Sequence, residues 1–231
     1  MVENCTVTIC DNGTVIKKHL TCANRRPAVK VFNENGCCFH YECESVCSLW
    51  SKKHYMTLYR VGYISHQFCE YFLVREIIHK SSLSVSVDNH KCDPADGSFC
   101  PQAVTVSFES YRILLTQLKD VGNVVYVNQK RVYPAYSNYD LLLTGTDMAI
   151  TLEIPAIKLK VVYRKDYFSI YLPYSLFSGN TEGLCGTCDN SQVNECCYPN
   201  GSCSDCADTW LVPGLHERPV SARSMPNHAD P

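Results

Sequence analysis

The stretch Val104-Thr105-Val106-Ser107-Phe108 alternates apolar and polar side chains with a period of two. A half-buried antiparallel strand requires this pattern, because successive side chains point to opposite faces of a sheet. No window shows the apolar stripe of a helix of ordinary length. The same alternation, or a β-branched and aromatic run that favours strands, recurs at residues 83–87, 124–127, 150–154, 157–161 and 167–172. We therefore predict a mainly β fold.

The distribution of cysteines and turn residues outlines the domains. No cysteine lies between Cys100 and Cys185, so a hydrophobic core must hold that stretch. We predict an antiparallel β-sandwich domain with a disulfide-rich C-terminal loop over residues 47–212, after a cysteine-rich N-terminal segment, residues 1–46. Residues 213–231 are rich in proline and poor in apolar side chains, which predicts a disordered tail. Turn chemistry separates the strands at residues 93–97, 145–147 and 178–180.

The cysteine content indicates an oxidising compartment. The chain has 16 cysteines among 231 residues, an even count and a density typical of small secreted modules. Three glycosylation sequons, at Asn4, Asn12 and Asn200, fit the same compartment. The first residues lack the regions of a signal peptide, so we expect a fragment of a longer secreted, extracellular glycoprotein. We expect disulfides at Cys5, Cys10, Cys22, Cys37, Cys38, Cys43, Cys47, Cys69, Cys92, Cys100, Cys185, Cys188, Cys196, Cys197, Cys203 and Cys206.

The charge balance excludes two classes of partner. The formal net charge is −2 at pH 7. Without a basic excess the chain has no electrostatic footprint for nucleic acid, and without clustered Lys and Arg it has none for an anionic membrane surface. No stretch approaches about 18 consecutive apolar residues, so we expect no segment that spans a bilayer.

Two C-x2-C pairs leave two chemical alternatives open. Cys185 and Cys188 are separated by 14 residues from Cys203 and Cys206, a spacing that in a cytosolic protein indicates a four-thiolate zinc site. The first pair also has the form of a thioredoxin-like redox motif, but no helix pattern follows it to lower a thiol pKa. The many other cysteines favour structural disulfides over zinc binding and redox catalysis.

Nothing in the sequence indicates an enzyme. The eight histidines show no H-E-x-x-H motif and no pair at i, i+4. A G-x-S-x-G elbow, a P-loop and a G-x-G-x-x-G fingerprint are also absent from the sequence. We expect no catalytic residues.

Two stretches carry a family resemblance. Residues 37–50 read C-C-F-H-Y-E-C-E-S-V-C-S-L-W and lead to His54-Tyr55-Met56-Thr57. They resemble the start of a von Willebrand factor type D domain of a gel-forming mucin, where C-C-x-x-Y-E-C precedes C-S-G-W-G-D-P-H-Y-V-T-F-D-G. Residues 180–188, N-T-E-G-L-C-G-T-C, are similar to the N-T-E-G-Q-C-G-T-C end of the same domain. The resemblance covers residues 5–213 and is strongest to a late D domain, an architecture that otogelin-like glycoproteins share.

This resemblance implies a structural role. Such D domains are rigid, disulfide-locked modules of secreted mucin-like glycoproteins, which link through cysteines into polymers or gels of the extracellular matrix. The implied partners are other mucin or matrix glycoprotein chains. The alternative is an extracellular ligand- or protein-binding module that uses sandwich loops, which an exposed aromatic patch would favour.

The resemblance also implies particular cysteine pairs. By position, the family pattern pairs Cys47 with Cys185 and Cys92 with Cys100, and it pairs Cys69 with either Cys203 or Cys206.

One processing site of similar domains is altered. Where they carry Gly-Asp-Pro-His, with an acid-labile Asp-Pro bond, this chain reads Ser51-Lys52-Lys53-His54. We expect no self-cleavage at this point, so mildly acidic incubation followed by reduction should leave one intact chain on a gel.

A calcium site implied by the resemblance is weakened. Family members use the aspartate of T-F-D-G, where this chain has Tyr59 followed by Arg60, so one anionic ligand is lost and a cation is added. Calcium prefers six to eight oxygen ligands, several of them carboxylates. We expect no cofactor beyond a weak calcium site, whose remaining oxygen donors would be Thr187, Asp189, Asn194 and Glu195. An equal alternative is that these four residues only form solvated turns and bind no calcium.

Overall fold

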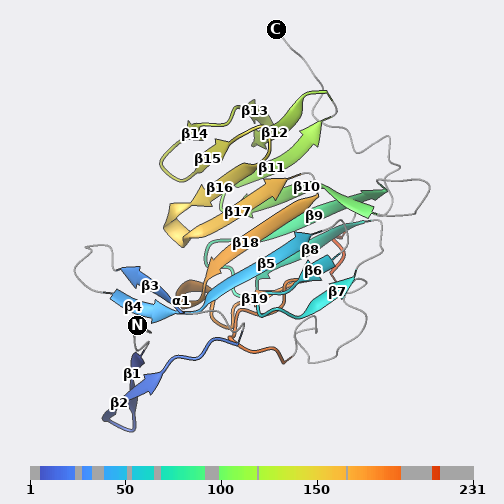
Figure 1. Ribbon diagram of the computed structural model, residues 1–231. Helices are drawn as coiled ribbons and strands as arrows, with labels where there is room; N and C mark the ends of the chain where they lie inside the picture. Colours follow the sequence, from blue (N-terminus) through green and yellow to red (C-terminus); the bar gives the residue numbers. More distant parts are fainter. Residues whose placement is uncertain are drawn as a thin grey trace.

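The computed structural model describes residues 6–23, 28–32, 39–50, 54–64, 69–91, 99–118, 120–164, 166–193 and 210–213. Two antiparallel sheets face each other and form a sandwich (Figure 1). The seven-stranded sheet runs in the order β13 (Lys130–Val132), β12 (Gly122–Val127), β11 (Tyr111–Leu118), β10 (Phe99–Phe108), β9 (Ser84–Lys91), β8 (Glu70–Glu76) and β19 (Thr181–Glu182). The predicted mainly β sandwich is thereby confirmed.

The eight-stranded sheet covers the other side of the core. Its order is β14 (Tyr136–Ser137), β15 (Leu142–Gly145), β16 (Ile150–Ile154), β17 (Leu159–Arg164), β18 (Tyr167–Pro173), β5 (Glu44–Trp50), β6 (His54–Met56) and β7 (Gly62–Ile64). Strand β5, from the start of the sandwich, therefore pairs with β18, from near its end, and places Cys47 opposite Ile170.

The core forms between the two sheets because each alternating segment turns its apolar side chains inward. Val104 and Val106 of β10 are fully buried, as are Ile150, Leu152 and Ile154 of β16. Residues of both sheets belong to one continuous hydrophobic cluster. A buried tyrosine also joins the sheets, since the Tyr163 hydroxyl donates a hydrogen bond of 2.8 Å to the backbone oxygen of Gln102.

One predicted strand begins later than the sequence pattern suggested. Residues 157–161 alternate, but a 3-10 helix, η1 (Pro155–Ile157), comes first and β17 begins at Leu159. Pro155 lacks a backbone donor and its fixed φ favours a turn. Lys158, with a φ of 50°, then reverses the chain and donates its N–H to the Pro155 oxygen. The alternation of side chains gives no sign of this turn.

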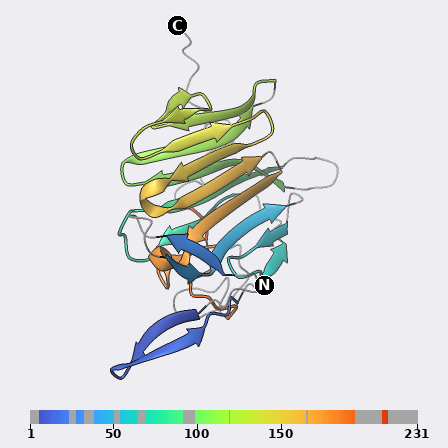
Figure 2. The same cartoon turned by 60° about the vertical axis from the view of Figure 1, so that its left-hand side comes forward.

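Two hairpins precede the sandwich. Strands β1 (Thr6–Asp11) and β2 (Thr14–His19) project away from it in both views (Figures 1 and 2), and every residue of β2 is exposed. The hairpin of β3 (Val29–Phe32) and β4 (Phe39–Glu42) lies beside the start of β5. Neither hairpin was predicted from the sequence.

The helical content is small. The α-helix α1 (Tyr174–Phe177) follows β18, and no helix among the described residues is long and apolar enough to cross a membrane. The predicted disordered tail lies outside the described residues, apart from Pro213.

Candidate functional site

A buried disulfide joins the two ends of the sandwich. Cys47 of β5 and Cys185, just after β19, are bonded with their Cα atoms 5.5 Å apart, and both side chains are buried. Backbone hydrogen bonds hold Cys185 on both sides, since its N–H donates to Leu73 and its oxygen accepts from Leu58, each at 2.9 Å. This is the pair that the resemblance implied, and it links segments 138 residues apart.

A second disulfide holds the N-terminal segment. Cys22 and Cys43 are bonded at a separation of 21 residues, and Cys43 lies between β4 and β5. Sequence reasoning left this pair open, because cysteine spacing alone does not give connectivity. The bond fixes the segment after β2 to the strand that carries Cys47.

The remaining expected cysteines are only partly described. Cys100 is disulfide-bonded and Cys69 is half-buried at the start of β8, while Cys92, expected to pair with Cys100, lies outside the described residues. The side chain of Cys10 is not described. The other expected disulfide residues outside the described part are Cys5, Cys37, Cys38, Cys196, Cys197, Cys203 and Cys206.

Cys188 differs from the expectation that every cysteine forms a disulfide. It is a buried free thiol, with its Sγ 3.3 Å from the Ser45 Oγ and 3.7 Å from the Tyr59 hydroxyl. Burial raises the pKa of this thiol, which keeps it in the protonated and unreactive form. Since Cys185 is bonded to Cys47, the first C-x2-C pair is neither an internal disulfide nor half of a four-thiolate zinc site.

The loop after Cys185 contains two of the four expected calcium ligands, Thr187 and Asp189. The Asp189 Oδ1 accepts the Ser191 N–H at 2.9 Å, and desolvation raises the pKa of this carboxyl. Thr187 lies beside it, half-buried, whereas Asn194 and Glu195 lie outside the described residues. In the part of the chain that the structure describes, no group of three or more His, Cys, Asp or Glu side chains is placed to hold a metal.

One expected glycosylation site is well described. Asn12 and Gly13 form the turn between β1 and β2 with φ angles of 48° and 79°, the positive values that a tight hairpin turn demands. The side chains of Asn12 and Thr14 are exposed there. Asn4 and Asn200 lie outside the described residues.

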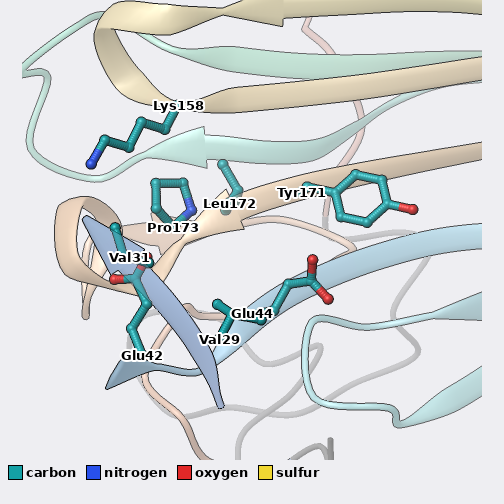
Figure 3. A pocket seen from close by; sticks show the side chains of 8 residues that line it. All are labelled: Val29, Val31, Glu42, Glu44, Lys158, Tyr171, Leu172 and Pro173. Atoms are coloured by element: carbon teal, nitrogen blue, oxygen red, sulfur yellow. The ribbon is translucent and has the colours of Figure 1, made fainter. Parts of the chain in front are cut away.

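A pocket of about 210 Å³ lies where the β3–β4 hairpin meets the sandwich (Figure 3). Val29 of β3 and Leu172 of β18 line it together with the carboxylates of Glu42 and Glu44. The buried Glu42 carboxylate accepts the Ser175 N–H of α1 at 3.0 Å. This carboxylate thus holds the hairpin against α1, which is a structural role.

The sequence of this chain matches a known domain family. A profile of the von Willebrand factor type D domain matches residues 47–202, more than half of the chain. The chain belongs to the von Willebrand factor type D family. The matched range begins at Cys47 and contains Cys185, so it includes both cysteines of the long disulfide.

This VWD domain is similar to gel-forming mucins. It is 33% identical to Mucin-5AC of Homo sapiens over 240 residues, 38% identical to Mucin-5B of Homo sapiens over 234, and 34% identical to Mucin-2 of Mus musculus over 225. These alignments cover 96%, 92% and 90% of this chain. The chain spans only 4%, 4% and 5% of the length of those relatives.

Proposed function

We propose that this VWD domain is a structural assembly module of a secreted, mucin-like extracellular glycoprotein. The observation that carries the proposal is the buried Cys47–Cys185 disulfide, which closes the sandwich between its first and last segments. Pulling on the chain outside this disulfide cannot extend the segment that it encloses, which suits a building block of a polymer or gel. The mucin relatives support the same class of protein.

The proposed partners are other mucin or matrix glycoprotein chains, joined through cysteines. The residues of the site support a non-enzymatic role, since the buried thiol of Cys188 has a raised pKa and the buried Glu42 carboxylate holds a backbone N–H.

Disulfide mapping tests this proposal. The protein would be expressed in secreting cells, digested without reduction and analysed by peptide mass spectrometry. We expect the Cys47–Cys185 peptide pair in the monomer, and cysteine-linked peptides from two copies in any covalent oligomer. Secreted protein with Cys47 and Cys185 as free thiols would contradict the proposal.

One observation favours a second candidate function, a protein-binding module. Tyr133, between β13 and β14, and Tyr139, between β14 and β15, are 69% and 98% exposed. Side-chain hydrogen bonds stiffen the β14–β15 segment that carries Tyr139, because the Asn138 Oδ1 accepts the N–H groups of Asp140 and Leu141. Exposed aromatic side chains on a rigid loop are effective anchors at interfaces.

A matched pair of variants separates the two functions. If the loop binds a partner chain, Tyr139→Ala should weaken capture of purified mucin glycoprotein. The control is Tyr167→Ala, which replaces a half-buried tyrosine at the start of β18 and should leave capture unchanged. Equal capture by both variants and by the parent protein would reject the binding function and leave assembly as the proposed function.

A further inference from the structure

The turn between β6 and β7 buries a tyrosine where the family resemblance implied a calcium ligand. Tyr59 is fully buried, and its hydroxyl lies 3.0 Å from the Ser45 Oγ of β5. The turn is tight, since the Thr57 N–H donates to the Val61 oxygen at 3.0 Å and Arg60 has a φ of 70°. Burial raises the pKa of the Tyr59 phenol well above its usual value, so the ring carries no charge for a cation.

The loop after Cys185 is bound to this tyrosine at two points. The Cys188 Sγ contacts the Tyr59 hydroxyl at 3.7 Å, and the Gln192 side-chain amide donates to the Tyr59 backbone oxygen at 2.6 Å. In addition, the Cys188 N–H donates to the Thr181 Oγ1 at 2.7 Å. The loop is therefore attached both to the β6–β7 turn and to β19.

A third attachment reaches the N-terminal segment. The Asn190 Oδ1 accepts the Ala23 N–H at 2.8 Å, and the Asn190 Nδ2 donates to the Thr21 oxygen at 3.1 Å. Asn190 itself has a φ of 57°, a value that asparagine tolerates better than most residues. This amide joins two segments 167–169 residues apart in the sequence.

Three oxygens of this loop and of the β6–β7 turn already accept hydrogen bonds, and Asp189 is the only carboxylate among the described residues of the loop. The Tyr59 backbone oxygen, the Asp189 Oδ1 and the Asn190 Oδ1 each accept an N–H. The thiol of Cys188 is a soft ligand, which calcium does not favour. The described residues of this loop therefore do not fit a calcium site.

We propose that protein hydrogen bonds hold the loop over residues 187–193 in the place where calcium would act. We define the Tyr59 clasp as Ser45, Tyr59, Cys188, Asn190 and Gln192. The clasp fastens the C-terminal loop to β5, to the β6–β7 turn and to the segment that Cys22 anchors. The fold of this module is then independent of calcium.

The rate at which the Cys188 thiol is alkylated measures whether the hydrogen bonds of the Tyr59 clasp are intact. The oxidised protein would be treated with iodoacetamide, and alkylation of Cys188 would be followed by peptide mass spectrometry. We expect the same slow alkylation in calcium and in EGTA, because the bonds that bury Cys188 come from the protein. The melting temperature should also be unchanged by about 1 mM calcium, a concentration that occupies even weak extracellular sites.

Variants test the clasp itself. Asn190→Ala and Gln192→Ala each remove side-chain hydrogen bonds, so each should lower the melting temperature by about 2–6 °C and speed alkylation of Cys188 in both buffers. Asn123→Ala is the matched control, since the Asn123 amide donates to the Thr146 and Asp147 oxygens elsewhere in the sandwich. It should leave the alkylation rate unchanged. Faster alkylation of the parent protein in EGTA, or a rise in melting temperature of several degrees with calcium, would overturn the proposal.

Discussion

Single residues decide the geometry of the end of the sandwich that holds the disulfide. Gly183, between β19 and Cys185, has a φ of 130°, and a Cβ built there would lie 2.7 Å from the Leu73 carbonyl carbon. The Leu184 and Cys185 N–H groups bond to the Phe72 and Leu73 oxygens just beyond this point. The backbone of β8 thus comes so close that only glycine fits.

We expect Gly183→Ala to destabilise the protein by roughly 2–4 kcal/mol, because the new methyl group meets backbone atoms that cannot move aside. Gly179→Ala is the control. Gly179 has a φ of 66° with nothing within 4 Å of a Cβ, so the change should cost only about 1–2 kcal/mol of backbone strain. Urea unfolding of both oxidised variants measures the difference, and equal losses would show that the contact with Leu73 is unimportant.

The sequence indicated some of these residues and not others. It marked Tyr59 as a replaced aspartate, but it gave no sign that the Tyr59 hydroxyl would meet Ser45 and Cys188. Those contacts join segments 14 and 129 residues apart, and they depend on how the sheets pack. A pattern of neighbouring side chains cannot contain that information.

At the scale of elements, strands with a strict apolar–polar alternation were predictable, whereas β5, β8 and β11 have buried faces and were not predicted. The alternation at residues 83–87, 104–108 and 150–154 lies within or against β9, β10 and β16, all of which pack on the core. The β1–β2 hairpin lies outside the sandwich, and every residue of its strand β2 is exposed. Its Asn-Gly turn was noticed only as a glycosylation sequon, although this dipeptide is also a hairpin signal.

The exposed hairpin makes Asn12 an accessible acceptor for a glycan. In protein secreted from animal cells, we expect enzymatic removal of N-glycans to lower the mass of the peptide that contains Asn12. Thr14→Ala should remove that glycan and leave the melting temperature unchanged, because it breaks the sequon at an exposed position of β2 and keeps the Asn12-Gly13 turn. The control is Asn128→Gln, which changes an asparagine that lies in a turn but not in a sequon and should therefore leave the mass of the glycan unchanged. An unmodified Asn12 in the secreted protein would contradict this prediction.

At the scale of the whole molecule, two disulfides of different loop length act on different parts. Cys47–Cys185 spans 138 residues and encloses almost the entire sandwich, whereas Cys22–Cys43 spans 21 residues before it. In the chain-entropy account, closing the longer loop stabilises the fold by about 5 kcal/mol and closing the shorter one by about 3 kcal/mol.

We therefore expect Cys47→Ala with Cys185→Ala to lower the free energy of unfolding more than Cys22→Ala with Cys43→Ala, by about 2 kcal/mol. The variant that lacks the Cys47–Cys185 bond should unfold at a lower urea concentration. The fluorescence of Trp210, which is buried in the folded protein, measures this unfolding. If both double variants unfold at the same concentration, the long bridge does not dominate stability.

The bridge from Asn190 to Thr21 and Ala23 sets where a recombinant fragment should be cut. The family match begins at residue 47, yet a fragment cloned from that residue would lack the partners of Asn190 and the Cys22–Cys43 bond. It would also lose Glu42, which holds the start of α1. For crystallography or display, a cloning boundary ahead of Thr21 retains all of these contacts, so the unit to express is longer than the unit that sequence profiles delimit.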